Sequence, residues 1–113
     1  MKFRMFAAVV LLLGSVGVHA GANITSNSST VTDITFYSSY GGGDVIFTVA
    51  AGGLQAPCPY GFWIRAADAA SKTLVAAVIW AYQTKTPILV GVDTTQIWSG
   101  AGSAACLVWD VKY

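Results

Sequence analysis

The chain has 113 residues, a length that allows one small domain and excludes two independent hydrophobic cores. Hydrophobic residues make up 55% of the sequence and charged residues only 10%, with a formal net charge of +1. Because the cations are few and dispersed, they form no basic stripe that could hold a phosphate backbone, and we expect no nucleic-acid partner.

The first 20 residues have the pattern of a secretory signal peptide. Lys2 and Arg4 precede an apolar run from Met5 to Val18, and Val18-His19-Ala20 places small residues at the −3 and −1 positions of a cleavage site. The run is too short for a membrane span, so we expect none. We predict cleavage after Ala20 and export to the periplasm or the extracellular space.

Cleavage would leave four cations, five aspartates, no histidine and no glutamate. A Ser-His-Asp or Cys-His nucleophile needs an imidazole, so neither could form. The aspartates are scattered singly, as turn and cap residues are, rather than paired for acid–base work. Asp44 follows three glycines at a position where a phosphate-binding loop needs a lysine. We therefore expect a protein that is not an enzyme and holds no metal or cofactor.

The two cysteines of an exported chain predict one disulfide, because that environment is oxidising. With two cysteines the pairing is Cys58–Cys106, which in the loop-entropy account closes about 49 residues and stabilises the fold by about 4 kcal/mol. A free thiol is the alternative, although neither cysteine has a neighbouring cation that would activate it.

Residues 21–30 are small and polar and predict a flexible leader before a single domain at 31–113. Three strands with alternating apolar and polar residues are predicted at 31–38, 44–50 and 60–66. The glycine cluster at 41–43 predicts a hairpin turn between the first two strands. The second strand is expected to face its core with Val45, Phe47 and Val49.

One helix is predicted at 68–84, a segment rich in alanine and free of glycine and proline. Asp68 or Ser71 is expected to cap its start, and Thr86-Pro87 to end it. Two further strands, at 88–93 and 106–113, flank a polar loop at 94–105. The order β-β-β-α-β-β is mainly β with one helix and predicts a five-stranded Greek-key barrel of the OB-fold type. An open sheet with the helix packed on one face is the alternative.

The segments CPYGFWIRA, SKTLVAAVIWAYQTKTPILVGVD and CLVWDVKY resemble a group of small exported bacterial OB-fold proteins. In these, a strand entered through a cysteine precedes an alanine- and leucine-rich helix, and a second cysteine opens the last strand. More distantly, the region from Asp44 to Tyr113 is similar to the pentameric B subunits of AB-type toxins of the subtilase-cytotoxin kind. That resemblance implies a ring of five copies, helices lining a central pore and a shallow glycan pocket on each barrel. It carries over Cys58 and Cys106 as the disulfide and assigns no binding residue.

The helix has an unusual apolar content, with nine apolar or aromatic residues in a row from Leu74 to Tyr82. At about 100° per residue they cover its whole circumference, so packing on the barrel cannot hide them all. We predict a homo-oligomer whose interface residues are Val75, Ile79, Trp80 and Tyr82. The alternative is a structural or protein-interaction module that docks through this helix on another exported protein.

Trp98 differs from Trp63 and Trp109, which lie in predicted strands and are interpreted as packing residues. It belongs to a polar loop, where an aromatic ring beside hydrogen-bonding side chains is typical of a sugar site. We therefore predict an exported, non-catalytic carbohydrate-binding module, similar to a toxin B subunit. The candidate ligand-binding residues are Asp93, Thr94, Gln96, Trp98 and Ser99, with Tyr37, Ser38 and Tyr40 as a second segment. A loop tryptophan folded back over the barrel end, and a plain hairpin turn, are the alternatives.

Overall fold

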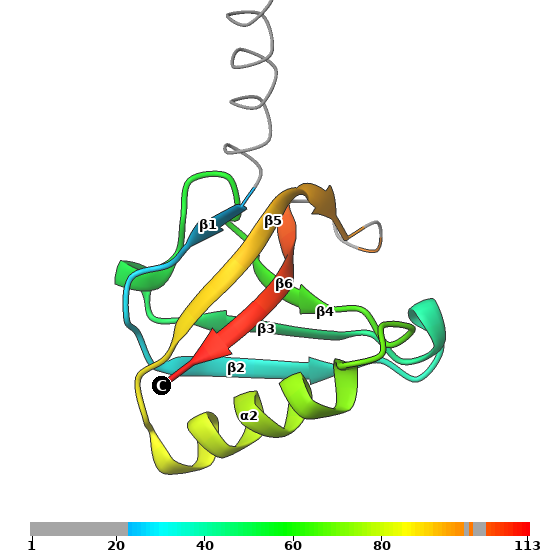
Figure 1. The fold of residues 1–113 in the computed structure, drawn as a ribbon, viewed down its shortest axis with the longest axis horizontal. Helices are drawn as coiled ribbons and strands as arrows, with labels where there is room; N and C mark the ends of the chain where they lie inside the picture. Colours follow the sequence, from blue (N-terminus) through cyan, green and yellow to red (C-terminus); the bar gives the residue numbers. More distant parts are fainter. Residues whose placement is uncertain (1–22, 99, 101–103) are drawn as a thin grey trace, which may run out of the picture.

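The computed structural model of the chain describes residues 23–98, 100 and 104–113 (Figure 1). The prediction of a mainly β protein with one helix is confirmed, but the predicted count of five strands is wrong, because the described residues form six. The elements are β1 (Asn23–Thr25), β2 (Val31–Phe36), β3 (Val45–Val49), β4 (Gly61–Ile64), α2 (Ser71–Thr84), β5 (Leu89–Ile97) and β6 (Ala105–Lys112). The predicted signal peptide at 1–20 lies outside the described residues.

The six strands form one sheet in the order β1-β5-β6-β4-β3-β2. Every neighbouring pair is antiparallel except β4 and β6, which are parallel. The two end strands, β1 and β2, are consecutive in the chain and are joined by residues 26–30. In this link Ser26 N–H donates to Val90 O at 2.8 Å, and Ser29 exchanges backbone bonds with Ile88 at 3.0 and 2.9 Å. The sheet is therefore curled, and residues 26–30 connect the strands at its two edges.

The prediction of a flexible leader at residues 21–30 is wrong from Asn23 onward. β1 pairs with β5, and Ser26 and Ser29 are buried. The Ser26 hydroxyl accepts a hydrogen bond from Val90 N–H at 2.9 Å, in the manner of a strand partner. A short polar strand of this kind is stabilised by its pairing across the sheet rather than by its own propensity, so the composition of the segment does not reveal it.

The core lies between the inner face of the curled sheet and α2. Val45, Phe47 and Val49 face it as predicted, and the rings of Phe47 and Phe62 lie 5.4 Å apart. The helix contributes the fully buried Val78 and Ala81. Figure 1 shows α2 running alongside β2. At about 25 cal/mol for each Å² of apolar surface removed from water, this cluster is the main source of stability.

The predicted disulfide between Cys58 and Cys106 is confirmed. Both cysteines are fully buried, and their Cα atoms lie 5.5 Å apart. The bond joins the turn before β4 to the start of β6, which is the parallel pair in the sheet. The pair β4–β6 joins strands β1, β5 and β6 to strands β4, β3 and β2, and the disulfide adds a covalent link to its hydrogen bonds.

The predicted helix caps are wrong. α2 begins at Ser71 rather than at residue 68, and its N-cap residue, Ala70, makes no side-chain cap bond. Asp68 pairs instead with Arg65, and the Ser71 hydroxyl donates to Ala66 O at 3.1 Å. The helix ends as expected before Thr86-Pro87, with Lys85 in the left-handed conformation (φ 58°). No helix among the described residues is long and apolar enough to cross a bilayer.

Candidate ligand-binding groove

The two segments predicted to bind a ligand meet in one aromatic cluster. The rings of Tyr37 and Tyr40, in the turn between β2 and β3, lie 5.1 and 5.6 Å from the ring of Trp98, which follows β5. The two tyrosine rings are 5.3 Å apart. Tyr40 is half exposed, whereas Tyr37 packs beneath it. The curled sheet therefore brings together residues that are far apart in the sequence.

Trp98 does not form the exposed platform that its polar loop suggested. Its side chain is only 4% exposed and its indole N–H donates to Asp44 Oδ2 at 3.1 Å. It packs with Ile46, Trp63 and Leu107, a row of apolar side chains on the outward face of β3, β4 and β6. Trp98 shields these apolar side chains from water, which is favourable because it removes apolar surface from solvent. The expectation of a stacking surface on Trp98 is corrected accordingly.

Asp44 holds the aromatic cluster in place. The carboxylate is 5% exposed. Its Oδ1 accepts a hydrogen bond from Ala66 N–H at 2.9 Å, and its Oδ2 accepts one from the indole N–H of Trp98. Its backbone N–H donates to Tyr40 O at 2.9 Å. One buried side chain thus links the β2–β3 turn, the segment after β4 and the segment after β5. Sequence analysis treated Asp44 as a turn residue and missed this role.

Asp93 and Gln96, two other predicted ligand-binding residues, line an open groove of about 490 Å³. Its polar walls are completed by Arg65 and Asp68, from the connection between β4 and α2. Trp109 of β6 lines the same groove. The rest of the surface is apolar and consists of Ala69, Ala70, Leu74, Leu107 and Val108.

Two irregularities in the β5–β6 ladder supply groove residues. On β5, Asp93 pairs with Leu107 and Ile97 with Cys106, so the register shifts between these two positions, where Gln96 lies. On β6, the consecutive residues Gly91 and Val92 of β5 face Asp110 and Val108, so Trp109 is the extra residue of a bulge. Bulges re-aim a side chain out of the alternation of a strand and are frequent beside functional sites.

The side chain of Trp109, the extra residue of this bulge, is 66% exposed. Asp110 Oδ1 accepts a hydrogen bond from Gly91 N–H at 3.1 Å, which takes the place of a regular ladder bond. A Cβ atom on residue 91 would collide with this carboxylate, so any other residue there would displace Asp110 from this bond. Sequence analysis interpreted Trp109 as a packing residue. The available signal was Gly91 inside an otherwise apolar strand, a position typical of a bulge.

Arg65 is fixed among several groups at the groove. Its Nη1 lies 3.4 Å from Asp68 Oδ1, and its Nη2 donates to Gln96 Oε1 at 3.2 Å. The guanidinium also lies 5.1 Å from the ring centre of Trp63, a distance at which a cation is attracted to an aromatic face. Its side chain is still about one-third exposed, so part of its donor set faces the groove.

Asp93 carries a negative charge in the groove. Thr95 donates to Asp93 Oδ1 from its hydroxyl at 2.6 Å and from its backbone N–H at 2.9 Å. These two bonds stabilise the ionised form and lower the pKa of Asp93 below its ordinary value of 3.8, with a smaller contribution from the charge of Arg65. With Asp68, the groove therefore holds two carboxylates and one guanidinium.

The other predicted residues lie apart from this groove or outside the description. Thr94 is half-buried in β5, Ser38 is exposed in the β2–β3 turn, and Ser99 lies outside the described residues. The predicted interface residues all lie on α2. Val75 and Ile79 are half-buried there, while Trp80 and Tyr82 are exposed, at 49% and 44%.

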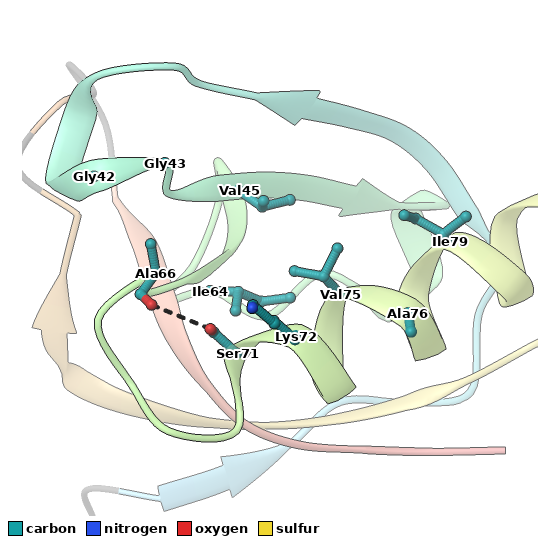
Figure 2. Close-up of a pocket in the computed structure, with 10 residues that line it drawn as sticks. All are labelled: Gly42, Gly43, Val45, Ile64, Ala66, Ser71, Lys72, Val75, Ala76 and Ile79. Atoms are coloured by element: carbon teal, nitrogen blue, oxygen red, sulfur yellow. Dashed lines mark hydrogen bonds between the residues drawn. The ribbon is translucent and has the colours of Figure 1, made fainter.

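A second cavity, of about 440 Å³, lies between α2 and the sheet (Figure 2). Val45 and Ile64 of the sheet and Val75 and Ile79 of the helix form its walls. Lys72 is the one charged residue in its lining. Because it offers few polar side chains, this cavity is less suited to a hydroxyl-rich ligand than the groove at Trp109.

No family model, no curated protein and no solved structure matches this sequence. The part of the chain that the structure describes contains no cluster of three or more His, Cys, Asp or Glu side chains placed to hold a metal ion.

Proposed function

We propose that this chain is an exported, non-catalytic carbohydrate-binding module that takes its ligand in the groove at Trp109. The observation that carries the proposal is the exposed ring of Trp109, which lies in one groove with the polar side chains of Arg65, Asp93 and Gln96. Sugar rings have an apolar C–H face and a rim of hydroxyls, so they need both an aromatic surface and hydrogen-bonding groups at its edge.

The polar rim of the groove fits hydroxyl ligands because it offers both donors and acceptors. The guanidinium of Arg65 donates, the carboxylates of Asp68 and Asp93 accept, and the amide of Gln96 can do both. Thr95 binds Oδ1 of Asp93, so Oδ2 is available to accept from a ligand. The bonds between Arg65, Asp68 and Gln96 hold these groups before a ligand arrives, which reduces the entropy lost on binding.

A glycan array probed with the purified protein tests the proposal. We expect binding to at least one oligosaccharide and a loss of at least about tenfold in affinity for Trp109→Ala, as for a central aromatic contact. Trp80→Ala is the matched control, because Trp80 is also exposed but lies on α2, outside the groove. Equal affinity of both variants, each with its fold intact by circular dichroism, would contradict the proposed site.

We further infer that the sheet is an OB-fold-like barrel in which β1 and β2 act as two halves of one first strand. The parallel pairing of β4 with β6, the helix between β4 and β5, and the link at 26–30 support this. The buried disulfide is compatible with export. A toxin B-subunit-like role follows from the resemblance and is part of the proposal.

The second candidate function is a protein-interaction module that docks through α2. It is favoured by the exposed aromatic side chains on this helix, Trp80 and Tyr82. In that case the groove at Trp109 would be ordinary surface, and no glycan on the array would bind. The two functions are therefore separated by the same experiment.

A further inference from the structure

One flank of α2, beside the large cavity, carries a regular stripe of four residues. Lys72, Ala76, Ile79 and Gln83 follow one another at intervals of four, three and four, which places them on one face of the helix. The opposite side contains the buried Val78 and Ala81, and so packs on the core. This spacing of residues is typical of a helix face that packs against another helix.

The two halves of this helix face have complementary shapes. Beside the N-terminal half lies the apolar cavity of about 440 Å³, with Val45 and Ile64 in its wall (Figure 2). Beside the C-terminal half the ring of Tyr82 is 44% exposed, next to a smaller cavity. A hollow and a projecting aromatic ring thus lie toward opposite ends of the same surface.

The two ends also carry opposite charges. Lys72 lines the large cavity, and Asp33 of β2 lines the smaller cavity together with Gln83. Both side chains are exposed, and within the described part of the chain neither makes an ion pair or a side-chain hydrogen bond. Each charge is therefore available to a group outside the chain.

We propose that a second copy of this chain covers the face, with the two α2 helices packed antiparallel about a two-fold axis. The midpoint between Lys72 and Gln83 falls between residues 77 and 78, and rotation about an axis there exchanges the two ends of the stripe. Ala76 then packs beside Ile79 of the partner subunit, a small residue against a large one. Lys72 approaches Asp33 of the partner subunit, and the exposed Tyr82 ring of each copy enters the large cavity of the other.

A single rotation satisfies every one of these contacts twice, which is the property of a two-fold interface. A ring of five copies would instead join two different surfaces. The inference does not depend on the sugar site, because the groove at Trp109 and the α2 stripe share no residue.

Charge exchange tests the proposed pairing in the protein purified after expression of the full chain. Light scattering and sedimentation velocity at about 100 µM should give a mass of two copies, since association depends on concentration. Lys72→Asp and Asp33→Lys should each raise the dissociation constant at least about tenfold, because each places like charges together twice. The double exchange should restore the dimer. Lys112→Asp, on β6, is the matched control and should leave it unchanged.

A cross-link tests the antiparallel register. With a rise of about 1.5 Å per residue, the two Ala76 residues would lie about 4.5 Å apart along the axes and about 6–7 Å between Cα atoms, within disulfide range for closely packed helices. Ala76→Cys should therefore form a covalent dimer on mild oxidation. Thr73→Cys should not, because its two copies would lie about 13.5 Å apart along the axes.

The proposal is overturned by a strict monomer at this concentration or by a mass of five copies. It is equally overturned by a dimer whose dissociation constant is unchanged by Lys72→Asp and Asp33→Lys, or by one in which Ala76→Cys does not cross-link.

Discussion

Asp44→Ala should destabilise the fold more than any other single aspartate substitution we describe. The change removes the acceptor of two buried hydrogen bonds, from Ala66 N–H at 2.9 Å and from the Trp98 indole at 3.1 Å. Bonds to a charged group contribute about 1.5–3 kcal/mol each, which gives about 3–6 kcal/mol for the pair. The cost of burying the carboxylate offsets part of this, so we expect the free energy of unfolding to fall by about 2–4 kcal/mol.

The assay is urea unfolding followed by tryptophan fluorescence, with Tm from circular dichroism as a second measure. A loss of about 2–4 kcal/mol corresponds to a fall in Tm of about 10–20 °C for a domain of this size. Asp44→Asn should be intermediate, because its amide oxygen replaces one acceptor while its NH₂ faces the other donor. Asp68→Ala, which removes a surface ion pair, should cost less than about 1 kcal/mol. If Asp44→Ala lies within about 0.5 kcal/mol of the wild type, the reasoning on this residue is refuted.

Two further predictions concern the disulfide and the groove. Replacing both Cys58 and Cys106 by Ala should lower the free energy of unfolding in urea by about 4 kcal/mol, the entropy of closing a loop of this length, and a loss below about 1 kcal/mol would contradict it. Thr95→Val should raise the pKa of Asp93, followed by NMR of its carboxyl carbon, because the strongest bond to the carboxylate is lost. Since the folded-state pKa is lowered, this bond stabilises the protein above the unfolded pKa of 3.8, and its contribution disappears as pH falls through the folded value. The stability difference between wild type and Thr95→Val should therefore be present at neutral pH and absent in acid; a difference that persists in acid, or an unchanged pKa, would contradict it.

Much of the fold could be predicted because the relevant patterns are local. The alternation of Val45, Phe47 and Val49 marks a half-buried strand, and the alanine-rich segment before Pro87 marks the helix. β1 could not be predicted, because Asn23–Thr25 has no apolar pattern and is held by its pairing with β5. The helix start was misplaced because Asp68 pairs with Arg65, three residues before it, instead of capping the helix.

The candidate site was predicted in part, and two tryptophans exchanged their expected roles. Asp93 and Gln96 do line a groove, but Trp98 is buried over the outer face of the sheet while Trp109 is exposed. The alternation of the last strand predicts a regular ladder, whereas the real register skips Trp109 between the partners of Gly91 and Val92. Register depends on pairing between distant segments, so a single sequence does not reveal which tryptophan is turned outward.

The most direct test of the sugar site is an NMR titration of the indole N–H signals of the four tryptophans with an oligosaccharide selected on the array. The account predicts that the signal of Trp109 shifts on binding, together with the side-chain signals of Arg65 and Gln96, and saturates with the same affinity. The signals of Trp80 and Trp98 should stay in place, because one lies on α2 and the other is buried beneath Tyr37 and Tyr40. A saturated complex in which Trp109 does not move, or in which Trp80 moves instead, would contradict it.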